Sequence, residues 1–234
     1  MTRLESQLSG SSAGFVLAGG RSSRMGSDKA LVLFHGVPLI QIAMQILIAA
    51  GLPARVAGVR ASLAAFAEQV PEQIPDTFPD AGPLAGVHAA LTASASEWNV
   101  FLPVDLPLMP ASLLVCLLLR AALTGTPVTA TRLNGRIEPF PVVLNRTALP
   151  GIVQLLHSGQ TACHTAWQSI PVALGAKLDA VSVEHLTQCG QCRHPQGLPP
   201  FLWFQSANTP ADLTRLHRIS IQNAEHPQPP NPVS

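Results

Sequence analysis

The chain has 234 residues, of which 47% are hydrophobic and 12% charged, and its formal net charge is +1. This length and composition suit one folded α/β domain with a sizeable core and exclude an intrinsically disordered chain. The near-neutral charge gives no electrostatic reason to expect nucleic acid as a partner, so any anionic ligand needs a local cluster of positive groups.

The sequence predicts a cytoplasmic protein. Its first fourteen residues lack the apolar stretch of a signal peptide. The longest apolar runs, Leu39–Leu52 and Leu113–Leu123, are too short for a membrane span. The number and spacing of the four cysteines do not suggest a secreted disulfide framework. They are Cys116, Cys163, Cys189 and Cys192.

Hydrophobic periodicity predicts alternating strands and helices between two polar tails, residues 1–12 and 222–234, that flank a single domain over residues 13–221. In chain order, the first elements are a strand at Gly14–Leu17, an edge strand at Leu31–Phe34, a helix at Pro38–Ala50, strands at Arg55–Val59 and around Ile74, and a helix that starts after Gly82-Pro83 and ends near Ala93. There follow a strand at Val100–Pro103, a helix at Pro110–Leu123, strands at Val128–Thr131 and Val142–Leu144, helices at Thr147–Leu156 and Thr161–Ile170, a strand at Phe201–Phe204, and a helix at Pro210–His217. This alternation predicts a mostly parallel central sheet with helices on both faces, and ligands at the carboxyl ends of its strands.

The loop after the first strand, Leu17 to Lys29, is rich in glycine and basic residues. Its glycines, including Gly19 and Gly20, allow positive φ and close approach to a ligand, and inward-facing backbone N–H groups form an anion-binding concavity. Arg24 and Lys29 supply positive charge for phosphates. The spacing fits neither a P-loop nor a dinucleotide-binding motif. A glycine-rich surface turn is the alternative interpretation.

Two carboxylates are candidates for the site. Asp105 directly follows the apolar run Val100–Pro103, where it suits a magnesium ligand, although it could instead cap the next helix or begin a turn. Asp76 precedes Gly82, at the start of a helix whose N-terminus can face a nucleotide. Asp76 and Gly82 could equally form an ordinary turn.

Two further segments remain open. Arg136–Pro139 is a candidate for the acceptor side of the site, and a hairpin turn at Asn134-Gly135 is its alternative. Cys189 and Cys192, with His185 and His194, invite a zinc or redox interpretation, whose alternative is an exposed insertion with reduced thiols.

Taken together, these residues resemble the molybdenum cofactor guanylyltransferase family. The resemblance spans nearly all of residues 14–218. It rests on five segments of the sequence: Leu17–Lys29, Gly36–Ile40, Asp76 with Gly82–Gly86, Pro103–Pro107, and Asn208–Leu213.

This resemblance implies a Rossmann-like nucleotidyltransferase fold and Mg²⁺-dependent transfer of GMP from GTP to the phosphate of molybdopterin, with release of pyrophosphate. It also implies handover of the product to molybdenum-cofactor and acceptor-enzyme proteins. The implied nucleotide-binding residues are Leu17, Ala18, Gly19, Gly20, Lys29, Asp76, Gly82 and Asp105. The implied metal ligands are Asp105 and Asn208, and the expected catalytic residues are Arg24, Lys29 and Asp105.

The sequence departs from the family pattern at Ser27, at Ser206 and over residues 184–200, which are expected to form a cysteine-containing loop insertion. Rival hypotheses are a cytidylyltransferase for molybdopterin, an enzyme for a sugar phosphate, a non-catalytic nucleotide-binding protein, and a zinc-binding interaction module.

Overall fold

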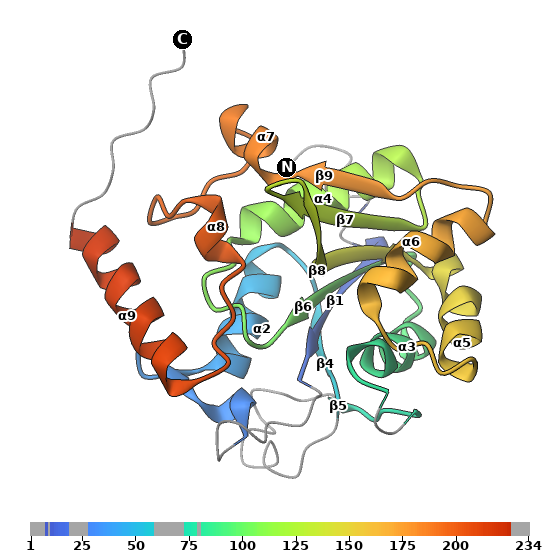
Figure 1. Ribbon diagram of the computed structural model, residues 1–234, viewed down its shortest axis with the longest axis horizontal. Coiled ribbons are helices and arrows are strands. Elements are labelled where there is room, and N and C mark those ends of the chain that lie inside the picture. Colours follow the sequence, from blue (N-terminus) through green and yellow to red (C-terminus); the bar gives the residue numbers. More distant parts are fainter. Residues whose placement is uncertain (1–7, 9, 19–27, 59–72, 79–80, 226–234) are drawn as a thin grey trace.

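A computed structural model describes residues 8, 10–18, 28–58, 73–78 and 81–225. Seven strands form one sheet in the order β5-β4-β1-β6-β8-β7-β9 (Figure 1). The strands are β1 (Ser12–Leu17), β4 (Ala54–Ala57), β5 (Gln73–Ile74), β6 (Trp98–Pro103), β7 (Val128–Leu133), β8 (Arg136–Asn145) and β9 (Asp179–Ser182). All neighbouring pairs are parallel except those of β8 with β6 and with β7. The predicted mostly parallel sheet is confirmed.

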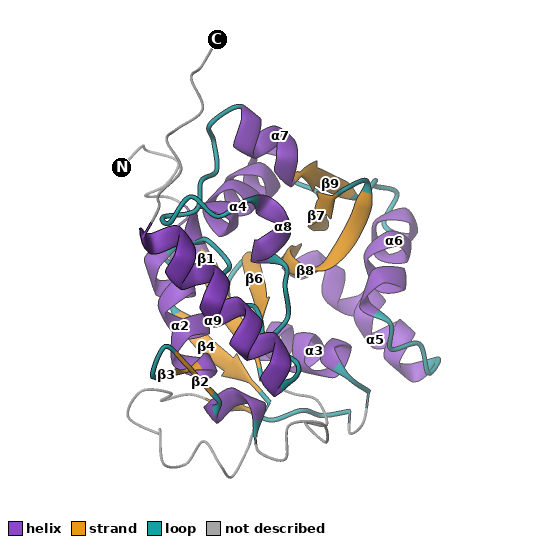
Figure 2. Ribbon diagram, turned by 60° about the vertical axis from the view of Figure 1, so that its left-hand side comes forward, coloured by secondary structure: helices purple, strands orange, loops and turns teal. Residues whose placement is uncertain are grey.

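Helices cover both faces of this sheet (Figures 1 and 2). On one face lie α2 (Leu39–Ala49), α4 (Ala111–Thr124) and α9 (Pro210–Glu225), and on the other lie α3 (Pro83–Ala93), α5 (Leu149–His157) and α6 (Cys163–Ala173). The remaining elements are short: η1 (Lys29–Leu31), η3 (Arg146–Ala148), α7 (Val183–Gln188), α8 (Pro200–Trp203) and the ribbon of β2 (Leu33–Phe34) with β3 (Val37–Pro38). The α/β Rossmann-like class is therefore confirmed.

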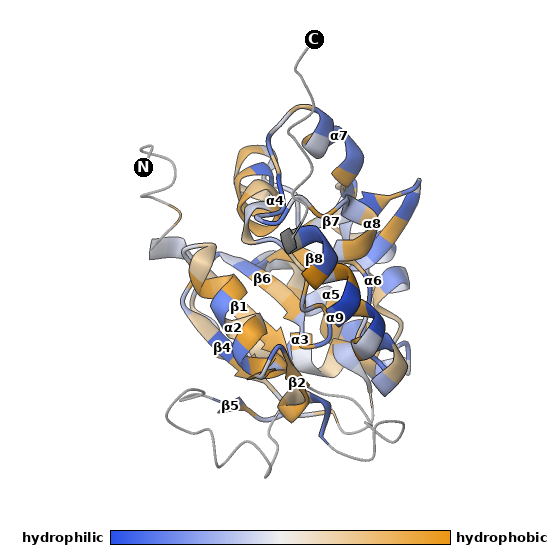
Figure 3. Ribbon diagram, turned by 90° about the vertical axis from the view of Figure 1, so that its left-hand side faces the viewer, coloured by the Kyte–Doolittle hydropathy of each residue, from blue (hydrophilic) through white to orange (hydrophobic). Residues whose placement is uncertain are grey.

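The alternation of side chains along β1 explains why the sheet needs helices on both sides. Val16 packs into the core under α2, α4 and α9, whereas Phe15 and Leu17 pack into the core under α3, α5 and α6. Successive residues of a strand point to opposite faces, so an all-apolar strand is stable only when both faces are covered. Figure 3 shows the central strands in predominantly hydrophobic colours, whereas α9 carries both hydrophilic and hydrophobic residues.

Two expectations for the C-terminal part differ from the structure. The segment expected as a strand at Phe201–Phe204 begins as a helix, α8, because Pro200 occupies its first turn and Leu202 and Trp203 pack inward. The expected loop insertion at 184–200 begins within α7, whose N-cap Ser182 accepts a hydrogen bond from the backbone N–H of His185. Neither α7 nor β9 was expected. An edge strand as short as β9 gives little periodic signal.

The expected tails also differ at their inner boundaries. β1 begins at Ser12, which is buried and pairs with Trp98 of β6. At the other end, α9 continues to Glu225, past the expected boundary at residue 221. The predicted edge strand at Leu31–Phe34 is reduced to the two residues of β2, which pair with β3 in a separate two-stranded ribbon.

The hairpin interpretation of Asn134-Gly135 is confirmed. Both residues have positive φ, 49° and 77°, and they connect Leu133 of β7 to Arg136 of β8, which lie opposite each other. This is the two-residue turn that matches the twist of antiparallel strands. Within the described residues, no helix combines the length and apolar character that crossing a bilayer requires.

Candidate active site

The carboxyl ends of β1 and β6 form the floor of the candidate site. The two strands run parallel, and their pairing extends one residue beyond Pro103, where the N–H of Val104 donates to the carbonyl of Leu17 over 3.2 Å. Asp105 comes next in the chain, so its carboxylate leaves the sheet at the edge where ligands bind in α/β folds.

Lys29 connects Asp105 and Asn208. Its Nζ lies 2.8 Å from Oδ2 of Asp105 and donates a second hydrogen bond to Oδ1 of Asn208. The side chains of Lys29 and Asp105 are each 19% exposed, so this ion pair is largely shielded from solvent but still reachable. Residues separated by as many as 179 positions in the sequence thus converge on one ammonium group.

A capped turn holds Lys29 in this position. Asp28 accepts a hydrogen bond from the backbone N–H of Ala30 over 3.1 Å and begins the 3-10 helix η1. Ala30 is fully buried, which anchors the turn against the core. Asp is a preferred residue at this capping position because its short carboxylate satisfies an otherwise unpaired N–H group.

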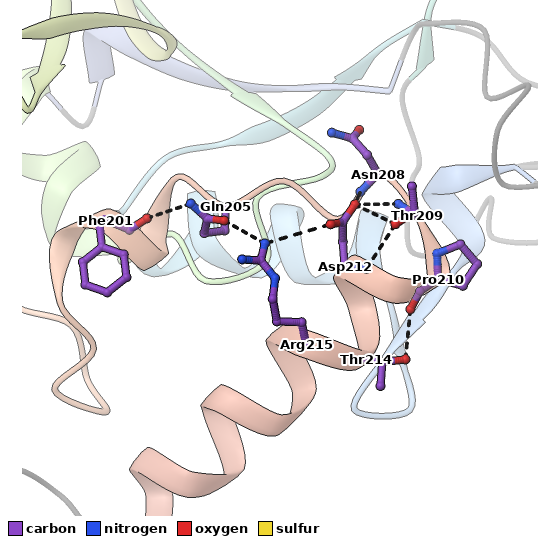
Figure 4. Close-up of polar contacts among 8 residues, drawn as sticks. All are labelled: Phe201, Gln205, Asn208, Thr209, Pro210, Asp212, Thr214 and Arg215. Atoms are coloured by element: carbon purple, nitrogen blue, oxygen red, sulfur yellow. Dashed lines mark hydrogen bonds and ion pairs between the residues drawn. The ribbon is translucent and has the colours of Figure 1, made fainter.

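Asn208 is positioned by the start of α9. Thr209 and Asp212 form a reciprocal capping box, in which Asp212 accepts from the N–H and hydroxyl of Thr209 at 2.9 Å each, and Thr209 accepts from the N–H of Asp212 at 3.1 Å (Figure 4). Asp212 also accepts from the N–H of Asn208 over 3.2 Å. These bonds lower the pKa of Asp212, with the hydroxyl of Thr209 as the largest cause.

A backbone bond ties this segment to the floor of the site. The N–H of Ala207 donates to the carbonyl of Asp105 over 2.9 Å. The motif Asn-Thr-Pro-x-Asp therefore works as a unit: its Thr and Asp cap the helix, its Pro suits the first turn, and its Asn reaches the site.

Lys29 and Asp105 line a cavity of about 490 Å³, which is large enough for a nucleotide-sized ligand. On the side of β1 and α3 the cavity is lined by Leu17 and Pro83. On the side of β8 and α6 its walls include Glu138, Phe140, Cys163 and His164, and the segment after α8 contributes Phe204 and Ser206.

The other candidate nucleotide residues lie at the ends of β1 and β5 and at the start of α3. A Cβ atom added at Gly86 would lie 3.3 Å from Leu17 and 3.6 Å from Oδ1 of Asp76, so Asp76 and Leu17 flank the first turns of α3. Gly82 caps that helix with a φ of 64°, a conformation that glycine adopts without strain. Ala18 is buried and its N–H donates to Ala57 of β4. Gly19, Gly20 and Arg24 lie outside the described residues.

Glu138 is the main addition that the sequence alone did not specify. The segment Arg136–Pro139 was a candidate for the acceptor side, but which side chain faces the cavity depends on the β7–β8 register. Burial raises the pKa of Glu138, against a smaller opposing effect of Arg136. Burial also raises the pKa of Cys163 to about 12, so this thiol stays neutral at pH 7.

The four candidate zinc ligands are not gathered at one point. Cys189 lies 3.6 Å from Nε2 of His185, whereas Cys192 is buried 3.3 Å from the hydroxyl of Ser112. His194 stacks against Trp203 instead. Among the described residues there is no group of three or more His, Cys, Asp or Glu side chains that could hold a metal. The structure thus does not support the zinc interpretation, and the alternative of an exposed insertion with reduced thiols holds for Cys189 but not for the buried Cys192.

Comparison with known proteins agrees with this geometry. The model of the MobA-like NTP transferase domain matches residues 14–170. A relative from Xanthomonas euvesicatoria pv. vesicatoria, named molybdenum cofactor guanylyltransferase, is 44% identical over 104 residues, which are 43% of this chain and 50% of the relative. One of the same name from Bordetella pertussis is 37% identical over 155 residues, 63% of this chain and 77% of the relative. The chain thus spans about half the length of the first relative and three quarters of the second.

Solved structures support the fold. Molybdopterin-guanine dinucleotide biosynthesis protein A from Archaeoglobus fulgidus superposes with a TM-score of 0.71 at 20% identity, covering 90% of this chain and 99% of that one. The strand order, the convergence of Lys29 and Asp105 at the end of β6, and the matched family model lead to one conclusion. The chain belongs to the MobA-like NTP transferase family.

Proposed function

We propose that this protein transfers GMP from GTP to the phosphate of molybdopterin and releases pyrophosphate. The observation that carries the proposal is that Lys29 and Asp105 line one cavity beyond the ends of β1 and β6, with Asn208 hydrogen-bonded to Lys29. The names of the curated relatives support the choice of GTP and of a molybdopterin acceptor.

Lys29 is proposed to bind the phosphates of the nucleotide. Its ammonium group is a compact positive charge held at the cavity wall. Arg24, from the same glycine-rich loop, is proposed to neutralise charge that develops on the departing pyrophosphate. Gly19 and Gly20 are proposed to bring backbone N–H groups close to the nucleotide, with Leu17, Ala18, Asp76 and Gly82 beside its base and sugar.

The oxygen atoms around Lys29 fit a magnesium ion. Asp105 offers a carboxylate and Asn208 an amide oxygen, and both already converge on one positively charged nitrogen. Magnesium prefers such oxygen ligands and is often held by one or two carboxylates together with waters and phosphates. When bound, Mg²⁺ supplies Lewis-acid stabilisation of the phosphate oxygens.

The residues of the site act mainly by positioning. In-line attack on the α-phosphorus requires the acceptor phosphate to lie opposite the leaving pyrophosphate, and stabilisation comes from fixed charges rather than from proton transfer. The acceptor phosphate is already anionic at pH 7, so no general base is needed. The neutral thiol of Cys163 is accordingly a wall of the cavity and not a nucleophile.

Transfer of CMP or of another nucleotide, and nucleotide binding without catalysis, are the competing functions. A pyrophosphate-release assay with molybdopterin and Mg²⁺, run with GTP, CTP, ATP and UTP in turn, separates them. We expect release with GTP and at least tenfold less with the other three. Release with CTP instead would replace the proposed specificity, and binding of a nucleotide without release would overturn the proposed catalysis.

A cytoplasmic location and handover of the product to molybdenum-cofactor and acceptor-enzyme proteins belong to the same proposal. All four cysteines are free thiols, which fits a reducing compartment.

A further inference from the structure

The cavity extends past the ion pair into a second half, formed by β8 and α6. β6 lies at the centre of the sheet order, with β1, β4 and β5 on one side and β8 on the other. The residues proposed to hold the nucleotide follow β1 and β5 or begin α3. The half of the cavity beyond Asp105 is therefore left for the acceptor.

Glu138 reaches this half because β8 runs antiparallel to β6. Phe101 of β6 lies opposite Val142 of β8, so the residues before Val142 come to the edge where β6 ends. Glu138 also lies opposite Thr131 of β7, which keeps it within the sheet rather than in a loop. Its carboxylate is thus placed by a register of strands, which is a rigid support.

The neighbouring backbone is fixed as well. The indole N–H of Trp167 donates to the carbonyl of Pro139 over 2.8 Å, and the ring of Trp167 meets Phe140 edge to face at 6.1 Å. Trp167 is fully buried. A side chain anchored on both sides in this way presents its functional group with little conformational freedom.

The carboxylate of Glu138 has few partners of its own. Within the described part of the chain it makes no hydrogen bond or close ion pair, and Arg136 acts on it only from a distance. On this side the cavity wall is formed by Pro139, Phe140, Thr161, Ala162, the neutral Cys163 and His164. A half-buried carboxylate in such surroundings is costly unless a ligand supplies donors.

We propose that Glu138 is a specificity-determining residue that binds the 2-amino-4-oxopyrimidine edge of the pterin acceptor. This edge carries a ring N–H and an amino N–H side by side, and these two parallel donors match the two oxygens of one carboxylate. The apolar walls around Phe140 suit the flat faces of the ring system. The inference rests on the proposed function, because it takes the acceptor to be a pterin.

The guanine base of GTP presents the same pair of donors, so the experiment must distinguish binding of the pterin from binding of guanine. The first arm uses no nucleotide: it is a fluorescence titration of the protein with 6-hydroxymethylpterin and with its lumazine analogue, 6-hydroxymethyllumazine, which has a carbonyl in place of the 2-amino group. We expect the wild type to prefer the pterin about tenfold or more. In Glu138→Gln this preference should vanish or invert, because an amide offers one acceptor and one donor.

The second arm compares GTP with ITP, which lacks the 2-amino group, in the presence of Mg²⁺. Glu138→Gln should bind GTP as the wild type does and keep the same ratio between GTP and ITP. The matched control is Glu97→Gln. Glu97 is exposed and lies just before β6, at the end of the strand opposite Asp105. This control should change neither the preference for pterin over lumazine nor the ratio between GTP and ITP.

Each outcome decides a separate point. A wild type that does not distinguish pterin from lumazine, or a Glu138→Gln variant that still does so normally, overturns the role of Glu138. A changed GTP-to-ITP ratio in Glu138→Gln assigns the carboxylate to guanine and also overturns it. If the wild type releases no pyrophosphate from GTP, the proposed function is refuted. The pterin titration uses no nucleotide, so its result can be read whether or not the wild type is active.

Discussion

The charges of Lys29 and Asp105 stabilise each other in a largely buried ion pair. Each side chain is only 19% exposed, and the pair is joined at 2.8 Å. Removing one partner leaves the other charge partly buried without its ion-pair partner, in addition to removing a group that we propose binds the substrate or its metal ion. A substitution here should therefore act strongly on turnover.

We predict that Lys29→Ala and Asp105→Ala each lower turnover with GTP by about two to three orders of magnitude, since a preorganised charge contributes roughly 3–4 kcal/mol to transition-state stabilisation. The measurement is steady-state pyrophosphate release by purified variants. Lys177→Ala, which removes an exposed lysine from the segment before β9, serves as the control and should retain full activity. A near-normal rate in either site variant would remove that residue from the mechanism.

The two principal site residues could be predicted from the sequence because their signal is local. Asp105 follows an apolar strand directly, and Lys29 ends a glycine-rich loop after another strand. The assignment of Glu138 to the cavity depends instead on the register of β8 against β6 and β7. A hairpin motif specifies the turn but does not say what lies across the sheet edge, so this residue needed the tertiary structure.

The start of α9 both stabilises that helix and positions a residue of the candidate site. Its capping box places Asn208 next to Lys29, and Ala207 fastens the segment to Asp105. The cap is thus a positioning device for a side chain that itself takes no part in the helix.

We predict that Thr209→Ala lowers the free energy of unfolding by about 1 kcal/mol, because the helix loses its N-cap. It should also lower kcat several-fold, since Asn208 is held less firmly once the hydroxyl of Thr209 no longer fixes Asp212. Thr214→Ala is a matched control on the same helix: its hydroxyl only bonds back to the carbonyl of Pro210, over 2.9 Å. That control should be nearly neutral in both urea unfolding and turnover. Equal effects of the two substitutions would contradict the positioning role.

Element types were predictable where periodicity was long and were missed where segments were short. The helices at Leu39–Ala49 and Ala111–Thr124 show a clear apolar face and were expected within one or two residues. The aromatic run Phe201–Phe204 has strand-forming residues, yet the preceding Pro200 and the inward packing of Trp203 favour a helix. Local propensity is overridden there by burial.

The whole molecule should lose stability as the pH falls, and His194 is the main cause. Burial lowers its pKa from 6.5 to about 4, while a hydrogen bond to the carbonyl of Leu108 opposes this effect. Nδ1 of His194 accepts from the N–H of Gln196 over 3.1 Å, a bond that requires this nitrogen to be unprotonated. The neutral ring therefore belongs to the folded state.

The pH dependence of the free energy of unfolding follows from proton binding by His194. Below about pH 6.5 the unfolded chain protonates His194 while the folded chain does not, so stability is complete above that pH and declines toward pH 4. We predict a loss of roughly 2–3 kcal/mol between pH 7 and pH 4.5 from this residue, to be measured by urea unfolding. His194→Gln should have a shallower pH profile than the wild type. His185→Gln, on an exposed side chain, should keep the wild-type slope. An unchanged slope in His194→Gln would exclude the residue as the cause.

At the scale of the whole fold, the account depends on one nucleotide–metal complex touching both Lys29 and Asp105. The most direct test is the affinity for GTP, measured by calorimetry with and without Mg²⁺, in the wild type and in Asp105→Asn. Mg²⁺ should tighten GTP binding to the wild type by about tenfold or more, and Asp105→Asn should abolish most of that gain. If Mg²⁺ tightens GTP binding equally in both proteins, Asp105 does not hold the metal and the account is contradicted.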